Sequence, residues 1–342
     1  MSIQKVLVTG GAGYIGAHTA VELVQAGIEP ILADDLSRSN SSLVKGIEKI
    51  IGRKVVFYNV DCNDLAQLQK IFQEQRDISH VIHFAAFKSV NESVLNPWLY
   101  YRNNIGTLLT LLDVMREFST SRLVFSSSCT VYGQPDEIPV TETSPFKKAE
   151  SAYGASKQMC ERILEDEVMA HHSLRVISLR YFNPIGAHPS GLIGELPIGV
   201  PNNLVPLITQ TAIGKREKLT VFGSDYATPD GSCLRDFIHI VDLAKAHVRA
   251  LEEIDGLPER YEAINLGSGK PVSVLEIIKT FIEVAGVPLN YSIGPRRAGD
   301  VEKVYADPRK SYQLLNWKTQ LSTEDALRDA WKWEKQLKYA AD

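Results

Sequence analysis

Short apolar runs rich in Val, Ile and Phe alternate with longer segments of helical period over the first half of the chain. Helix-like stretches such as residues 17–26 and 65–75 separate these runs. Strands that alternate with helices are joined by crossover connections, and such connections produce a parallel sheet. The pattern therefore predicts an α/β fold with a doubly wound parallel sheet of the Rossmann type. Its six predicted strands are centred on residues 6–8, 30–33, 55–58, 81–84, 123–125 and 176–179.

The pattern of the sequence changes after Arg180. Loops rich in Pro and Gly are predicted there, followed by shorter helices and strands in mixed order. We therefore expect a Rossmann domain over residues 1–180 and a smaller mixed α/β substrate domain over residues 181–342. A Lys/Glu-rich run near the end of the chain predicts a packed amphipathic helix. The aromatic residues of that run are Trp317, Trp331 and Trp333.

Charge and hydropathy narrow the class of ligand. The 342 residues carry 37 Lys and Arg against 41 Asp and Glu, a formal charge of -4. A nearly balanced chain has no cationic field for nucleic acid or anionic lipid, so we expect a small-molecule ligand and neither nucleic acid nor membrane as partner. No apolar stretch reaches membrane-spanning length, and the chain starts in a strand pattern without a signal peptide. We therefore expect a cytoplasmic protein.

The cysteines and histidines show no spacing typical of metal ligands, and no CxxC pair occurs. This pattern predicts reduced thiols, no disulfide framework and no metal site. The four cysteines are Cys62, Cys129, Cys160 and Cys233.

A glycine-rich turn follows the first predicted strand and opens a helix, with glycines at Gly10, Gly13 and Gly16. Glycine permits a tight turn, close approach of the backbone to a pyrophosphate, and close packing of helix on strand. Asp34 ends the second predicted strand, where an acid can accept hydrogen bonds from both ribose hydroxyls. A 2′-phosphate would meet like charge from Asp34 and Asp35, so the turn predicts NAD rather than NADP, although Arg38 nearby leaves NADP open.

A second chemical signal is Tyr153 followed four residues later by Lys157, near the start of a predicted helix. That spacing places both side chains on one face of the helix. A phenol has an ordinary pKa near 10, but a nearby ammonium and a positive nicotinamide ring favour the phenolate. We therefore predict that Tyr153 moves a substrate hydroxyl proton, that Lys157 assists it, and that Ser128 at the preceding strand end hydrogen-bonds the same oxygen.

Together, the segments 9–16, 125–133 and 153–157 resemble the extended short-chain dehydrogenase/reductases. Further segments extend the resemblance to the UDP-glucose 4-epimerase family over essentially the full chain; these are residues 83–88, 180–184, 201–204, 222–223, 234–239 and 295–300.

The resemblance implies NAD as cofactor and a UDP-hexose as substrate. It implies cofactor contacts beyond the glycines and Asp34, from Tyr14, Ile15, Asp35, Asp61, Cys62, Phe84, Ala85, Ala86, Lys88, Asn103, Tyr153, Lys157 and Tyr181. It implies substrate contacts from Ser128, Asn183, Asn203, Leu204, Phe222, Arg235, Arg297, Asp300 and Val304.

The residue types agree with these implied substrate roles. Arg235 and Arg297 carry forked donors that suit a diphosphate, and Phe222 offers an aromatic face to uracil. Side chains such as Asn183 and Asn203 offer hydrogen bonds to sugar and ribose.

The activity implied is interconversion of UDP-glucose and UDP-galactose through transient oxidation at C4 of the hexose, with NAD as a resident cofactor. At Val304 some family members carry Tyr and others a small residue, so we hypothesise that the pocket also admits N-acetylated UDP-hexosamines. A homodimer that pairs through residues 97–118 and 152–170 is a further expectation.

Three alternatives remain. A nucleotide-sugar 4,6-dehydratase shares the first oxidation, but Cys129 and Thr130 stand where such enzymes carry an Asp-Glu pair. A C4 epimerase of another UDP-sugar, such as a uronate or pentose, fits the same residues. A non-enzymatic NAD sensor would keep the glycine turn without the Tyr-Lys pair, which is present here.

Overall fold

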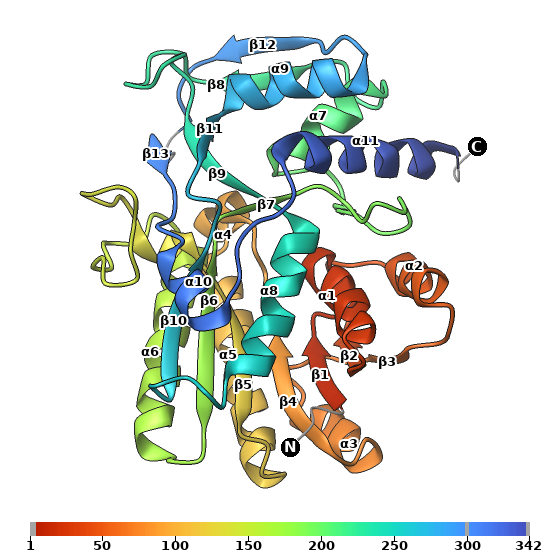
Figure 1. Ribbon diagram of the computed structural model, residues 1–342, viewed down its shortest axis with the longest axis vertical. Coiled ribbons are helices and arrows are strands. Elements are labelled where there is room, and N and C mark those ends of the chain that lie inside the picture. The colour runs from red at the N-terminus through yellow and green to blue at the C-terminus, as the bar shows by residue number, and fades with distance from the viewer. Residues whose placement is uncertain (1–4, 298–300, 340–342) are drawn as a thin grey trace.

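A seven-stranded parallel sheet forms the larger layer of the molecule (Figure 1). The computed structural model describes residues 5–297 and 301–339. All six strands predicted from the sequence are present, and a seventh joins them at one edge. In order across the sheet the strands are β10 (Tyr261–Leu266), β6 (Arg175–Tyr181), β5 (Arg122–Ser128), β4 (Ile78–His83), β1 (Lys5–Thr9), β2 (Glu29–Asp34) and β3 (Val56–Asn59).

Helices cover both faces of this sheet, because successive side chains of a strand point to opposite faces. In β1, Val6 and Val8 enter the core on one face and Leu7 enters the core on the other. The first face carries α1 (Tyr14–Gln25), α2 (Ser41–Ile51) and α8 (Ile240–Glu253). The opposite face carries α3 (Leu65–Glu74), α5 (Pro97–Glu117) and α6 (Ala152–Ala170), and the short α4 (Val90–Leu95) precedes α5.

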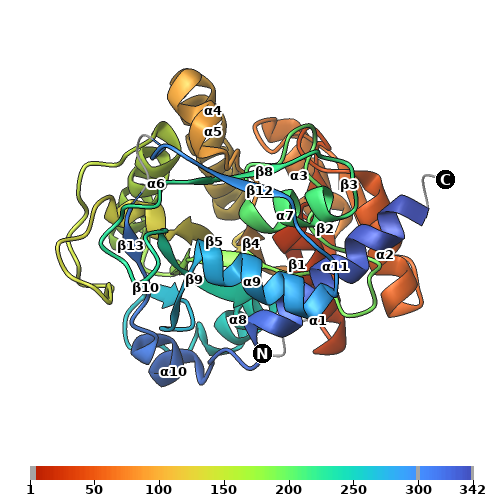
Figure 2. The same cartoon turned by 90° about the horizontal axis from the view of Figure 1, so that it is seen from above.

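A smaller layer lies over the carboxyl ends of the large sheet, as Figure 2 shows from above. One small sheet is centred on β9 (Leu234–His239), which pairs with β7 (Asn183–Ile185), β11 (Pro271–Ser273) and β13 (Lys303–Val304). A second pairs β8 (Leu219–Phe222) with β12 (Tyr291–Gly294). Helices α7 (Leu204–Ala212), α9 (Val274–Ala285) and α11 (Thr323–Tyr339) pack with these strands around their own apolar core.

The second half of the chain returns to the large sheet before it completes the smaller layer. Both α8 and β10 come from residues after 181, yet α8 packs beside α1 and β10 pairs in parallel with β6. We propose that the main division between the two domains lies at residues 180/181. The segments α8 and β10 then come after this boundary in sequence but pack in the Rossmann domain.

The predicted C-terminal amphipathic helix is α11, which carries Trp331 and Trp333. Trp317 lies outside it, in the connection that follows α10 (Arg309–Leu315), so the expectation that Trp317 belongs to this helix is wrong. Asn316 ends α10 in the left-handed conformation, which breaks the helix before Trp317. Trp317 is buried in the connection, where its indole nitrogen donates to the backbone oxygen of Asp242 at 2.9 Å. Among the described residues, no helix combines the length and the apolar character that a membrane crossing requires.

Candidate active site

A cleft of about 630 Å³ opens where the carboxyl ends of the large sheet meet the smaller layer. Parallel-sheet proteins bind their ligands at this edge. With two exceptions, every residue that the sequence analysis assigned to cofactor or substrate lines the cleft. Ser128, which is 8% exposed, does not line the cleft, and Asp300 falls outside the described residues.

The glycine turn forms the floor of one half of the cleft, at the start of α1. Gly10 has φ +68°, and a Cβ there would lie 2.9 Å from the backbone nitrogen of Ala85. A Cβ on Gly16 would lie 2.3 Å from the backbone oxygen of Gly10. Gly13 precedes α1 and no side chain caps the helix, so its first backbone N–H groups remain available to an anion. This turn therefore fits a pyrophosphate.

Asp34 ends β2 at the side of the turn and is almost fully buried. Its carboxylate accepts hydrogen bonds from the backbone nitrogens of Ala12 and Leu36, both at 3.0 Å, and from Ser39 Oγ at 2.6 Å. Burial raises the pKa of this carboxyl, while the hydrogen bonds lower it. The arrangement holds an acceptor where a ribose hydroxyl of a dinucleotide would lie.

Arg38, the residue that left NADP open, has partners of its own. Its Nη2 lies 2.7 Å from Glu92 Oε1, and its guanidinium carbon lies 4.7 Å from the centre of the Phe87 ring. An arginine held by a carboxylate is a weaker partner for a 2′-phosphate. The geometry therefore fits NAD better than NADP.

We expect Gly10→Ala to lower both stability and cofactor content. Alanine pays about 1–2 kcal/mol for the left-handed backbone, and its Cβ crowds the backbone that follows β4. Gly27→Ala is the matched control, because Gly27 has φ +78° with nothing within 4 Å of an added Cβ. Thermal unfolding should show a lower stability for both variants than for the wild type. Absorbance of bound nucleotide should fall only in Gly10→Ala, and equal nucleotide content in the two would contradict the expectation.

The predicted catalytic side chains come together at the end of β5. Ser128 is the last residue of β5, and Tyr153 and Lys157 lie in the first turns of α6. The helix begins there because Ser151 Oγ accepts a hydrogen bond from the backbone nitrogen of Gly154 at 3.2 Å. Lys157 Nζ donates to the backbone oxygen of Ser126 at 2.5 Å and lies 6.0 Å from the centre of the Tyr153 ring.

Burial shifts the pKa values of both Tyr153 and Lys157 on α6. Desolvation raises the pKa of Tyr153 to about 12, although a hydrogen bond with Ser128 lowers it. Desolvation lowers the pKa of Lys157 to about 8, so the ammonium is still mostly protonated at neutral pH. The chain alone therefore holds a neutral phenol beside a cation. A further positive charge beside the phenol, such as an oxidised nicotinamide ring, would favour its ionisation.

The other half of the cleft carries the residues predicted to hold the substrate. Arg235 lies on β9 and pairs in register with Val304 of β13. The guanidinium carbon of Arg297 lies 5.7 Å from the centre of the partly exposed Phe222 ring. Two arginines and an aromatic face thus occupy one end of the cleft.

One residue that the sequence analysis missed links the two halves. Glu195 Oε1 accepts from Lys88 Nζ at 3.0 Å and from Asn203 Nδ2 at 2.6 Å. Lys88 is predicted to contact the cofactor and Asn203 the substrate. Glu195 lies in a loop without hydrophobic periodicity, so no local pattern marks it.

A Rossmann sheet with a glycine turn, and a Tyr-Lys pair on the helix after the fifth strand, define the extended short-chain dehydrogenase/reductase class. The profile of the NAD dependent epimerase/dehydratase family matches residues 6–267. The chain therefore belongs to this family.

Known relatives confirm the narrower resemblance. A UDP-glucose 4-epimerase of Dictyostelium discoideum is 48% identical over 331 residues, which cover 97% of this chain and 96% of the relative. The structure of a Bifidobacterium longum UDP-glucose 4-epimerase in complex with NAD+ and UDP is 44% identical, with a TM-score of 0.94 and coverage of 97% and 98%. A Stenotrophomonas maltophila UDP-glucose 4-epimerase with NAD and formylated UDP-arabinopyranose is 43% identical, with a TM-score of 0.95 and coverage of 98% and 99%.

Proposed function

We propose that this chain interconverts UDP-glucose and UDP-galactose by inverting C4 of the hexose, with NAD as a resident cofactor. The observation that carries the proposal is a single cleft with two ends. The glycine turn and Asp34 line one end, Arg235 and Arg297 line the other, and the Tyr153-Lys157 pair lies on the same cleft. Curated relatives of this chain are UDP-glucose 4-epimerases. We assign NAD chiefly to residues 1–180 and the UDP-sugar chiefly to residues 181–342.

Tyr153, Ser128 and Lys157 have distinct roles in this reaction. When bound, NAD would supply a hydride acceptor for C4 and return the hydride later. The Tyr153 phenolate, which a bound oxidised nicotinamide ring and the Lys157 ammonium would favour, takes the proton of the C4 hydroxyl and gives it back when the hydride returns. The Ser128 hydroxyl donates a hydrogen bond to the same substrate oxygen. The Lys157 ammonium lies 6.0 Å from the centre of the Tyr153 ring, where a positive charge favours the phenolate, and the Ser126 backbone oxygen holds it at 2.5 Å.

Inversion requires that the oxidised sugar turn between departure and return of the hydride. The arginines at the far end suit a clamp on the diphosphate, because a guanidinium binds it with paired donors. Near Arg235, the wall of the cleft includes Val304 and Cys129, which pack with the buried Val131 and Phe182 in one apolar cluster. Apolar groups form no directional bonds to hydroxyls, so this wall leaves the sugar free to turn while the nucleotide stays fixed.

Incubation of the purified protein with UDP-galactose, without added NAD, tests the proposal directly. Proton NMR should show conversion to UDP-glucose. A 4-keto-6-deoxy product would instead support the dehydratase, and turnover only of a uronate or pentose nucleotide would support the epimerase of another UDP-sugar. Bound NAD without turnover of any UDP-sugar would support the sensor.

We propose that the small side chain at Val304 also admits UDP-N-acetylhexosamines. Val304 is buried in the apolar wall and is the last residue of β13, opposite Arg235 of β9. Val304→Tyr is expected to lower kcat/KM for UDP-N-acetylgalactosamine by roughly 10- to 100-fold, because an added ring takes the room of the acetamido group. The value for UDP-galactose should stay within a few-fold. Absence of acetylated turnover by the wild type would end this proposal.

A homodimer through α5 and α6 stays a prediction, and exposed apolar side chains on these helices support it. Trp98, Leu109, Met159 and Met169 are between 46% and 73% exposed. Large apolar groups on two neighbouring helices are typical of a protein interface. Light scattering at micromolar concentration should give twice the chain mass, and a monomer would contradict the proposal. The cytoplasmic location likewise stays a prediction.

A further inference from the structure

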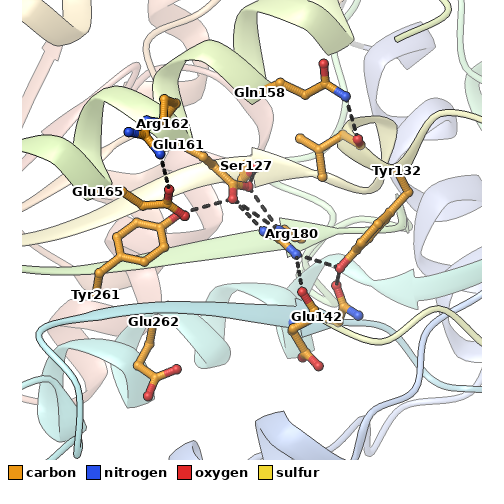
Figure 3. A network of polar contacts seen from close by, with 12 residues as sticks. Ser127, Tyr132, Glu142, Gln158, Glu161, Arg162, Glu165, Arg180, Tyr261 and Glu262 are labelled. Carbon is orange, nitrogen blue, oxygen red and sulfur yellow. Dashed lines mark hydrogen bonds and ion pairs between the residues drawn. The ribbon is translucent and has the colours of Figure 1, made fainter. Parts of the chain in front are cut away.

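A buried polar network joins β5, β6 and α6, the elements that carry or flank the proposed catalytic residues (Figure 3). Its centre is a two-pronged ion pair between α6 and β6. Arg180 Nη2 lies 2.7 Å from Glu161 Oε2, and Arg180 Nε lies 3.0 Å from Glu161 Oε1. Both side chains are almost wholly buried. The tyrosine at the edge strand β10, Tyr261, donates its hydroxyl to Glu161 Oε2 at 3.0 Å.

The network holds Ser128 from both sides along the chain. On one side, Ser127 Oγ donates a short hydrogen bond to Glu161 Oε1. On the other side, Tyr132 at the end of the short helix η1 (Cys129–Tyr132) accepts from Arg180 Nη1 at 2.9 Å. Tyr132 in turn donates to Asn265 Oδ1 at 2.6 Å. The end of β5 and the helix η1, which flank Ser128, are therefore both hydrogen-bonded to the same ion pair.

The same guanidinium also reaches the loop that leads into α6. Arg180 Nη1 donates to the backbone oxygen of Glu142 at 3.2 Å, and its guanidinium carbon lies 4.9 Å from the centre of the Phe146 ring. The carboxylate of Glu142 accepts from the backbone nitrogen of Asn265 at 2.7 Å. One ion pair thus connects β5, β6, β10, η1 and the loop before α6.

Buried ion pairs are weak sources of stability, because the cost of removing two charges from water offsets their attraction. A packed apolar cluster of the same size would fill this space at least as well. The pair holds Ser127 and Tyr132 on either side of Ser128 along the chain, and Glu161 lies one helical turn from Lys157. These positions suggest that its role is geometric and electrostatic.

We propose that the Glu161–Arg180 pair is a positioning element of the active site, which orients Ser128 and places a carboxylate one helical turn from Lys157. This inference rests on the proposed function. Neither residue lines the cleft, so both act through the residues that they hold.

The electrostatic part of the proposal concerns the groups that face Lys157. Burial lowers the pKa of Lys157 to about 8, whereas Cys160 and Glu161 raise it. The ammonium also lies 4.7 Å from the centre of the Phe125 ring on β5. Burial and, to a smaller extent, this ammonium lower the pKa of His83 on β4. Glu161→Gln removes a negative charge and leaves the Arg180 charge uncompensated. Both changes lower the pKa of Lys157.

The test compares Glu161→Gln with Glu334→Gln. Glu334 is a matched control because its buried carboxylate pairs with Lys215 at 2.7 Å in the smaller layer, away from the cleft. For Glu161→Gln, the alkaline limb of kcat for UDP-galactose should move to lower pH by about one unit, with KM within about twofold. For Glu334→Gln, stability should fall and the pH profile should stay in place. An unshifted profile in Glu161→Gln would overturn the electrostatic part.

Ser127→Ala tests the geometric part and is expected to fold even if Glu161→Gln does not. It frees the strand end from the network and keeps the Glu161 charge. We expect a kcat at least about fivefold lower at unchanged KM, with no shift of the pH profile. An unchanged kcat would overturn the geometric part.

A readout without turnover separates this inference from the proposed function. The pH dependence of the stability difference between a protein and its Lys157→Met derivative reports the pKa of Lys157. In the Glu161→Gln background, the rise of this difference with pH should begin at a lower pH. An inactive wild type would overturn the proposed function and with it the positioning role. An active wild type with no pH shift in either readout would overturn only the electrostatic part of this inference.

Discussion

Replacing Tyr153 by Phe is expected to lower kcat for UDP-galactose by roughly 10²- to 10⁴-fold, the usual contribution of a positioned acid or base. The variant keeps the ring and loses only the hydroxyl that moves the C4 proton. Cofactor content and thermal stability should stay close to the wild type, because a pKa of about 12 leaves the phenol uncharged at neutral pH. Proton NMR of the conversion and absorbance of the bound nucleotide measure the two effects separately.

Tyr58→Phe provides the control for loss of a tyrosine hydroxyl. Tyr58 lies on β3 and donates to Glu74 Oε2 at 2.9 Å, outside the cleft. Loss of the Tyr58 hydroxyl should leave kcat for UDP-galactose at the wild-type value. A Tyr153→Phe variant that turns over as fast as Tyr58→Phe would assign proton transfer to another group.

Replacing Lys157 by Met is expected to lower kcat by roughly 100-fold or more, since the phenol then loses the cation that favours its ionised form. Methionine fills similar space in the core. It leaves the Ser126 backbone oxygen without its partner, but it also removes a buried charge. We therefore expect the free energy of unfolding at pH 7 to change by no more than about 1 kcal/mol. Lys54→Met, at an exposed lysine paired with Glu48, should keep the wild-type kcat.

The stability difference between wild type and Lys157→Met should depend on pH with a definite sign. The pKa of Lys157 falls from 10.5 to about 8 in the folded protein, so the unfolded chain binds more protons between these values. The wild type should therefore gain stability relative to the variant as pH rises from about 8 to 10.5. Urea unfolding across this window measures the difference. A stability difference that does not change with pH across this window would show that the pKa of Lys157 is not lowered in the folded protein.

The local features of the chain could be predicted because their physical causes are local. The alternation of apolar runs and helical segments marks the six strands, since burial on both faces of a parallel sheet requires continuous apolar side chains. The helical repeat sets the spacing of Tyr153 and Lys157, and the glycine turn carries its own backbone requirement. These features were sufficient to predict the fold class, the glycine turn with Asp34 and the Tyr153-Lys157 pair. The other residues of the cleft were implied by the resemblance to the UDP-glucose 4-epimerase family.

The sequence by itself therefore determined the parallel sheet, the glycine turn with Asp34, and the pair on α6. Only the tertiary structure decided that β10 joins the large sheet, that Glu195 links Lys88 to Asn203, and that Arg180 meets Glu161. Each of these contacts joins residues whose approach depends on how whole elements pack. Hydrophobic periodicity records which face of an element is buried, but it does not record which distant residue lies against that face.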